Sequence, residues 1–238
     1  MSVRLPQRAL RWLSLPLLAG AIFWSLGQFD ARPRLAERQE RLYFPSGKFL
    51  CESALGFRET MADFLWFRFV QYYGAFAKDQ NDLRYFDVLI DGITRLDPRF
   101  VEAYYFASLV RLTDFADLDG ALDWLRRGIL YNPDCAKLKF QIGFIYYIVD
   151  HDYRRAAHWF ETAGRCSDAT DRERRFAAFA RKRAGDLRVS LELWRNLFES
   201  TDSPQMKDLA ATMIERLQRQ IQQRQAYGKD FIGPLPEL

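Results

Sequence analysis

The sequence predicts an all-α protein, a right-handed α-solenoid of about four helical hairpins with a C-terminal capping helix, preceded by one N-terminal transmembrane helix. Amphipathic segments recur with a period of about 35 residues, which is typical of stacked helical hairpins. No sustained alternation of apolar and polar residues indicates strands. Near the N-terminus, a stretch of eighteen residues carries no charge.

That uncharged stretch covers residues 12–29 and is flanked by arginines on both sides. A membrane-spanning helix needs at least about 17 apolar residues, and tryptophans such as Trp12 and Trp24 favour the two lipid–water interfaces. We therefore predict that residues 1–30 form a membrane anchor that contacts the bilayer through residues 12–29. Two alternatives stay open: a signal peptide cleaved between Gly27 and Gln28, or a buried core helix.

Arginines lie in similar numbers before and after the predicted span, so the positive-inside rule decides its orientation only weakly. A short basic N-terminus ahead of one apolar run usually stays in the cytoplasm. We expect a single-pass protein of the bacterial inner membrane with its solenoid on the periplasmic side. Residues 31–47 form a charged linker, and residues 48–66 form a helical segment that packs before the first hairpin.

The repeat is marked by Asp97-Pro98 and Asn132-Pro133, which lie 35 residues apart. Ten residues after each proline stands a small residue, Ser108 or Gly143, where two helices of a hairpin approach closely. Gly74 takes the same role in the first hairpin. Amphipathic stripes at helical spacing mark the second helices: Phe86, Ile90 and Ile93; Ala121, Leu125 and Gly128; and Ala156, Phe160 and Ala163.

A fourth, weaker unit follows, with a turn at Gly185-Asp186 and a second-helix stripe of Ser190, Trp194 and Leu197. Its first helix, about residues 171–184, is rich in arginine and lacks the large aromatic residue of the other units. Ser203-Pro204 then begins a long polar helix over residues 203–227, because serine caps helices and proline favours their first turn. Residues 228–238 contain two prolines and are expected to form an extended tail.

Together, these residues resemble the tetratricopeptide repeat, a helical hairpin of about 34 residues, over residues 67–200. The resemblance implies that the first helices of successive hairpins line a concave groove that binds a peptide or helix. Membrane-anchored bacterial members of this family commonly serve in envelope assembly, which is likewise implied by the resemblance alone.

The resemblance places nine residues in this groove. Most of them are aromatic or apolar, which suits a hydrophobic protein segment and not a C-terminal carboxylate. Alternatively, a neighbouring helix, the tail or residues 48–66 cover the rings. The candidate groove residues are Arg68, Gln71, Glu102, Tyr105, Leu109, Lys137, Phe140, Phe144 and Tyr147.

The composition and the other sequence motifs give no indication of a catalytic, metal-binding or nucleic-acid-binding site. Hydrophobic residues make up 49% of the chain, which excludes wholesale disorder, and a net charge of +4 with interspersed signs gives no reason to expect nucleic acid. Two histidines and three widely spaced cysteines form no metal motif, and no phosphate-binding or nucleophile motif is present. We expect no enzymatic activity and no cofactor.

These observations favour a membrane-anchored scaffold or adaptor that binds protein partners through an aromatic groove. Such a protein would be an accessory or assembly subunit of a membrane or envelope complex. The alternative is a soluble, exported peptide- or chaperone-binding module, released by cleavage after Gly27. The N-terminal sequence of the mature protein separates the two.

Overall fold

A computed structural model describes residues 24, 50, 52, 54–79 and 82–227. The chain divides into two units, residues 1–44 and residues 45–238, and nearly all described residues belong to the second. The predicted anchor (apart from Trp24), the linker over residues 31–47 and the tail over residues 228–238 lie outside the described residues. Among the helices described, none combines the length and the apolar character needed to cross a membrane.

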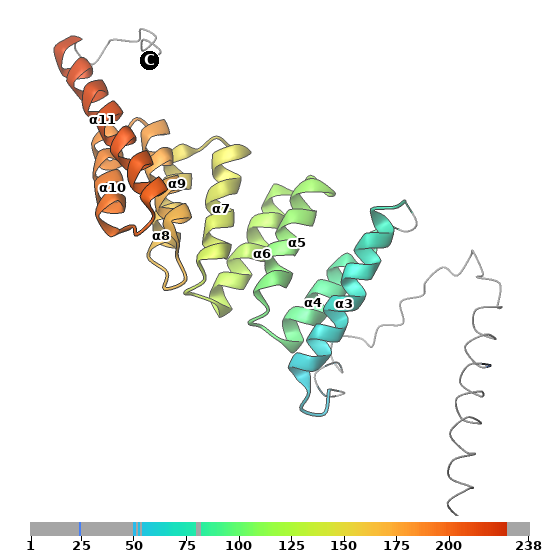
Figure 1. The fold of residues 1–238 in the computed structure, drawn as a ribbon. Helices are drawn as coiled ribbons and strands as arrows, with labels where there is room; N and C mark the ends of the chain where they lie inside the picture. Colours follow the sequence, from blue (N-terminus) through green and yellow to red (C-terminus); the bar gives the residue numbers. More distant parts are fainter. Residues whose placement is uncertain (1–23, 25–49, 51, 53, 80–81, 228–238) are drawn as a thin grey trace, which may run out of the picture. The chain divides into compact units, whose positions relative to one another are not determined.

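The described part of the second unit is all-helical (Figure 1), with each helix packed against its neighbours in the chain. This arrangement is consistent with a helical repeat. The helices are α3 (Arg58–Phe76), α4 (Phe86–Leu96), α5 (Val101–Thr113), α6 (Leu118–Tyr131), α7 (Ala136–Ile148), α8 (Tyr153–Gly164), α9 (Asp171–Arg183), α10 (Leu187–Ser200) and α11 (Pro204–Tyr227).

Helix α3 differs from the prediction at its start. The sequence placed a boundary between residues 66 and 67, whereas one uninterrupted helix runs from Arg58 to Phe76. The predicted boundary is wrong because residues 58–73 contain neither glycine nor proline to interrupt the helix. The break lies earlier, at Leu55 and Gly56, which both have positive φ angles, 45° and 92°.

The second helices α4, α6, α8 and α10 have the predicted packing stripes. Every stripe residue named from the sequence is buried, from Phe86, Ile90 and Ile93 in α4 to Trp194 and Leu197 in α10. The turn at Gly185 adopts a φ of 88°, which glycine reaches without a steric penalty. The hairpins therefore bury one face of each second helix.

The predicted role of the small residues holds for Gly143 but not for Gly74. A Cβ atom on Gly143 would lie 2.8 Å from a carbon of the Phe160 ring and 3.2 Å from the carbonyl oxygen of Ala156, so α7 and α8 meet here. A Cβ atom on Gly74 would meet nothing within 4 Å. The buried stripe of α3, which includes Leu65 and Phe69, lies on the opposite side of the helix, so Gly74 faces away from the core.

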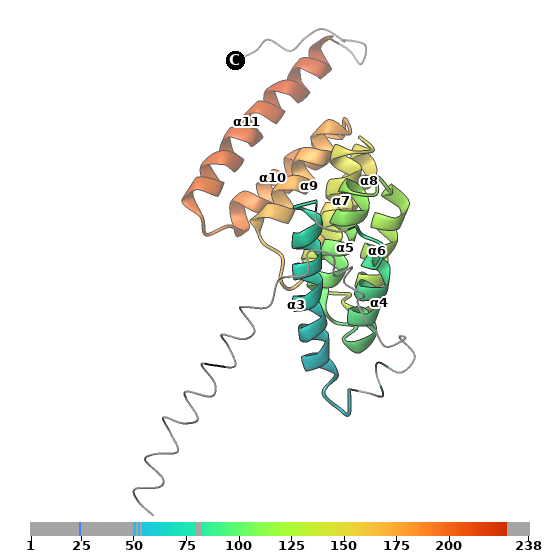
Figure 2. The ribbon, with the colours of Figure 1, turned by 90° about the vertical axis from the view of Figure 1, so that its right-hand side faces the viewer.

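Helix α11 covers the C-terminal end of the stack, as predicted. It begins at Pro204, and its N-terminus is capped by Ser203, whose hydroxyl oxygen accepts from the Met206 N–H at 3.4 Å. Its Met213 and Leu217 pack with Trp194 of α10. Beyond Ile221 its last turns extend past α10 (Figure 2), and residues 222–226 are exposed. The outer side of α11 is polar, as a terminal cap requires.

Candidate partner-binding surface

The first part of the candidate surface joins α5 to α7 by an ion pair. Lys137 Nζ lies 2.7 Å and 2.6 Å from the two carboxylate oxygens of Glu102. The same Nζ lies 4.3 Å from the centroid of the Tyr105 ring. The structure thus brings together three residues that are up to 35 positions apart in the chain. Their charges compensate each other, so this part of the surface carries little net charge.

The second part is a cluster of rings from α7, α8 and α9. On α7, Phe140 and Phe144 stack with their centroids 6.1 Å apart. Phe140 also packs on Phe160 of α8 at 5.0 Å, and Tyr147 packs on the same ring at 6.2 Å. Phe176 of α9 contacts Phe140 at 5.2 Å in edge-to-face geometry. Such pairs are worth about 0.5–1.5 kcal/mol beyond the area they bury, so each ring of the cluster stabilises its neighbours.

The rings of this cluster differ in exposure. Phe160 is fully buried, and Phe140, Tyr147 and Phe176 are half-buried. Phe144 is 37% exposed although it contacts Phe176 at 6.4 Å. The chain itself therefore covers part of the predicted aromatic surface, and Phe144 is the ring that remains most open to solvent.

Phe176 corrects the prediction that α9 lacks a large aromatic residue. The ring contacts Phe140, Phe144 and Tyr147 of α7, much as the Phe106 ring of α5 contacts Trp66, Phe69 and Tyr73 of α3. Sequence analysis missed it because arginines surround it and hide the apolar periodicity. Two of these arginines lie over rings: Arg172 Cζ is 4.4 Å from the Phe140 centroid and Arg175 Cζ is 5.7 Å from the Phe176 centroid.

The remaining candidates are Leu109 on α5 and Arg68 and Gln71 on α3. Leu109 is half-buried on α5, and Arg68 and Gln71 are exposed on α3. Helix α3 contacts α5 through other side chains, with the Trp66 and Tyr73 rings 5.9 Å and 5.0 Å from the Phe106 ring. One repeat period of 35 residues before Glu102 and Tyr105, the corresponding α3 residues are Phe67 and Val70. Both of them are exposed.

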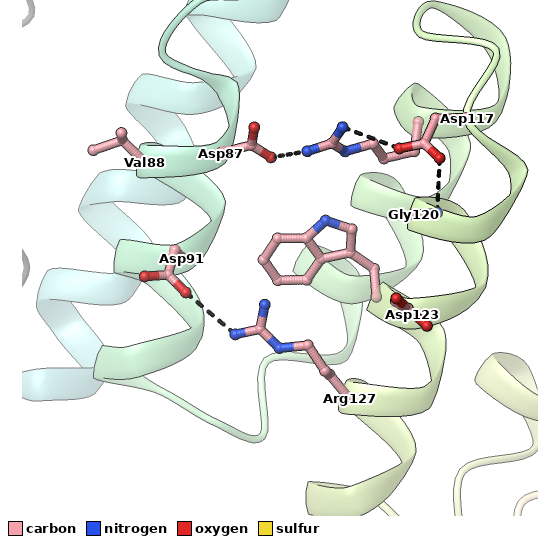
Figure 3. A pocket seen from close by; sticks show the side chains of 9 residues that line it. Asp87, Val88, Asp91, Asp117, Gly120, Asp123 and Arg127 are labelled. Carbon is pink, nitrogen blue, oxygen red and sulfur yellow. Dashed lines mark hydrogen bonds and ion pairs between the residues drawn. The ribbon is translucent and has the colours of Figure 1, made fainter.

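A charged cavity of about 420 Å³ lies on the side of the second helices, between α4 and α6 (Figure 3). Arg111 pairs with Asp87 of α4 and, at 3.1 Å, with Asp117, which also caps α6 by accepting from the Gly120 N–H. Arg127 pairs with Asp91 at 3.2 Å. The Arg111–Asp87 and Arg127–Asp91 pairs link α4 to α5 and α6.

Compared with known proteins, the chain matches no protein family and no curated protein.

Proposed function

We propose that this protein is a membrane-anchored tetratricopeptide-type scaffold that binds a protein partner through the surface of α5, α7 and α9. The proposal includes the right-handed solenoid and the bilayer contact through residues 12–29. It further includes a place in the bacterial inner membrane, with the solenoid on the periplasmic side, as an accessory or assembly subunit of a membrane or envelope complex.

The observation that carries the proposal is the exposure of Phe144 while its ring packs against Phe140 and Phe176. An exposed ring that neighbouring rings hold in place loses little conformational entropy on binding, and such rings are the usual anchors of protein interfaces. The compensated Glu102–Lys137 pair joins α5 to the same helix α7, and arginines of α9 lie over the Phe140 and Phe176 rings that contact Phe144. This chemistry suits an apolar helix face that carries an acidic residue on the side of α9.

The membrane anchor allows a weak partner-binding surface to be effective. A solenoid tethered to the bilayer meets partners in the same membrane at a high effective concentration, so a modest apolar contact suffices. Extraction with alkaline carbonate and N-terminal sequencing of the mature chain test this part. We expect the chain to stay in the membrane fraction with Met1 or Ser2 at its N-terminus, whereas a mature chain that begins at Gln28 would contradict the anchor.

The binding surface is tested by comparing Phe144→Ala with Lys137→Ala in the full chain. We expect Phe144→Ala to reduce capture of the co-purifying partner in mild detergent much more strongly, because buried aromatic anchors carry binding energy whereas rim charges mainly steer association. Phe198→Ala on α10 is the matched control, since Phe198 is 40% exposed. Partner capture that survives Phe144→Ala, or loss of the helical circular dichroism signal in this variant, would contradict the proposal.

A further inference from the structure

Helix α3 begins the described stack with an apolar side that nothing covers among the described residues. Phe64 and Phe67 are each 59% exposed, and Val70 is 48% exposed. With Gly74 and Ala75 they form what we call the α3 outer face, on the side of the helix opposite the buried stripe. Exposed large apolar residues clustered in this way mark an interaction surface.

Comparison with α7 and α11 indicates that another surface covers the α3 outer face in the assembled protein. Helix α7, whose apolar residues are spread around the helix as in α3, packs against α5, α6, α8 and α9. Helix α11, which ends the stack, is polar on its outer side. The terminal units of a helical stack need a polar outer side. Helix α3, at the start of the described stack, instead has Phe64, Phe67 and Val70 exposed on its outer side.

The sizes and charges of the side chains along α3 indicate which partner covers the α3 outer face. Bulky Phe64 and Phe67 occupy its first half, and small Gly74 and Ala75 occupy its second half. Asp63 lies in the second turn of α3 and Lys78 lies two residues beyond its end, about 22 Å away at 1.5 Å per residue. Neither is in an ion pair within the described part of the chain. A second α3 in antiparallel orientation would place phenylalanines over the small residues and each Asp63 beside Lys78 of the other copy.

We propose that two copies of this chain associate through their α3 outer faces, antiparallel and related by a two-fold axis near Val70 and Gln71. Two-fold contacts require a surface that is complementary to itself, which this face is in both size and charge. A parallel pair would instead oppose phenylalanine to phenylalanine and like charge to like charge. Because one helix pair buries little area, we expect association that depends on concentration.

The proposal is tested by cross-linking the full chain in membranes or nanodiscs. In a background with all three cysteines replaced by serine, Val70→Cys should form a covalent dimer with a short bismaleimide. Val88→Cys on α4 is the matched control, since Val88 is 50% exposed, and it should stay monomeric. Absence of a dimer with Val70→Cys, or equal dimer yields from both positions, would overturn the proposal.

Charge reversal distinguishes a second copy from lipid or an unrelated protein. In the Val70→Cys background, Asp63→Lys should lower the dimer yield several-fold, because each Lys78 then faces a lysine. Asp63→Lys combined with Lys78→Asp should restore the yield, since the two reversed charges pair again across the axis. Failure of the double variant to recover, while its circular dichroism matches that of the parent, would exclude the antiparallel pair. Neither result depends on Phe144, so the partner surface is tested separately.

Discussion

Gly143 determines how closely α7 and α8 pack, because any side chain at this position collides with Phe160 and with the backbone at Ala156. Gly143→Leu should therefore lower the free energy of unfolding by about 1–3 kcal/mol, the usual cost of overpacking a core. Urea unfolding followed by circular dichroism measures the change.

Gly74→Leu is the matched control, because the space around Gly74 is open. We expect no loss of stability there, and a small gain, since leucine forms helices better than glycine. The measurement should be made at low protein concentration, so that association through α3 does not contribute. Equal destabilisation by both substitutions would mean that α7 and α8 do not cross at Gly143.

At the scale of single elements, the N-terminus of α9 is held by a buried carboxylate. Glu173 is 1% exposed. It accepts from the Thr170 hydroxyl at 2.7 Å, from the Thr170 N–H at 2.8 Å and from Arg172 Nε at 2.9 Å. Burial by itself raises the pKa of Glu173, but these hydrogen bonds outweigh it, so that the pKa lies below its ordinary value of 4.5.

This lowered pKa makes the contribution of Glu173 depend on pH. The contribution is fully present above pH 4.5 and is lost as the pH falls through the lower pKa of the folded state. Glu173→Gln should cost about 1.5–3 kcal/mol at pH 7, typical of hydrogen bonds to a charged group. The difference in unfolding free energy between wild type and variant should shrink in acid below pH 4.5. A difference that stays constant over this range would contradict the role of the carboxylate.

The elements were predictable from the sequence to different degrees. The helices between Phe86 and Gly164 follow from two X-Pro turns and regular apolar spacing. Helix α3 was divided wrongly because no preceding repeat sets its register, and Phe176 was missed because arginines dilute the pattern of α9. The exposure of Phe144 was not predictable, because it depends on how far a ring from another helix covers α7.

At the scale of the whole described unit, each helix packs mainly against its chain neighbours. In such a stack, unfolding of a terminal helix destabilises only the adjacent helices. Leu217→Asp should detach α11, because Leu217 is fully buried beside Trp194. Amide hydrogen exchange should then accelerate in α9 and α10 but not in α5 and α6. The exposed neighbour Arg216→Asp should change neither region, and acceleration throughout the chain would contradict a stack of neighbouring units.

The central claim, that the surface around Phe144 binds a protein partner, is tested most directly by photo-cross-linking in membranes. Benzoylphenylalanine replaces Phe144 in one full-length chain and the similarly exposed Phe198 of α10 in another. We predict one discrete heterologous protein adduct from position 144 and none from position 198. No protein adduct at position 144, or the same adducts from both positions, would contradict the claim.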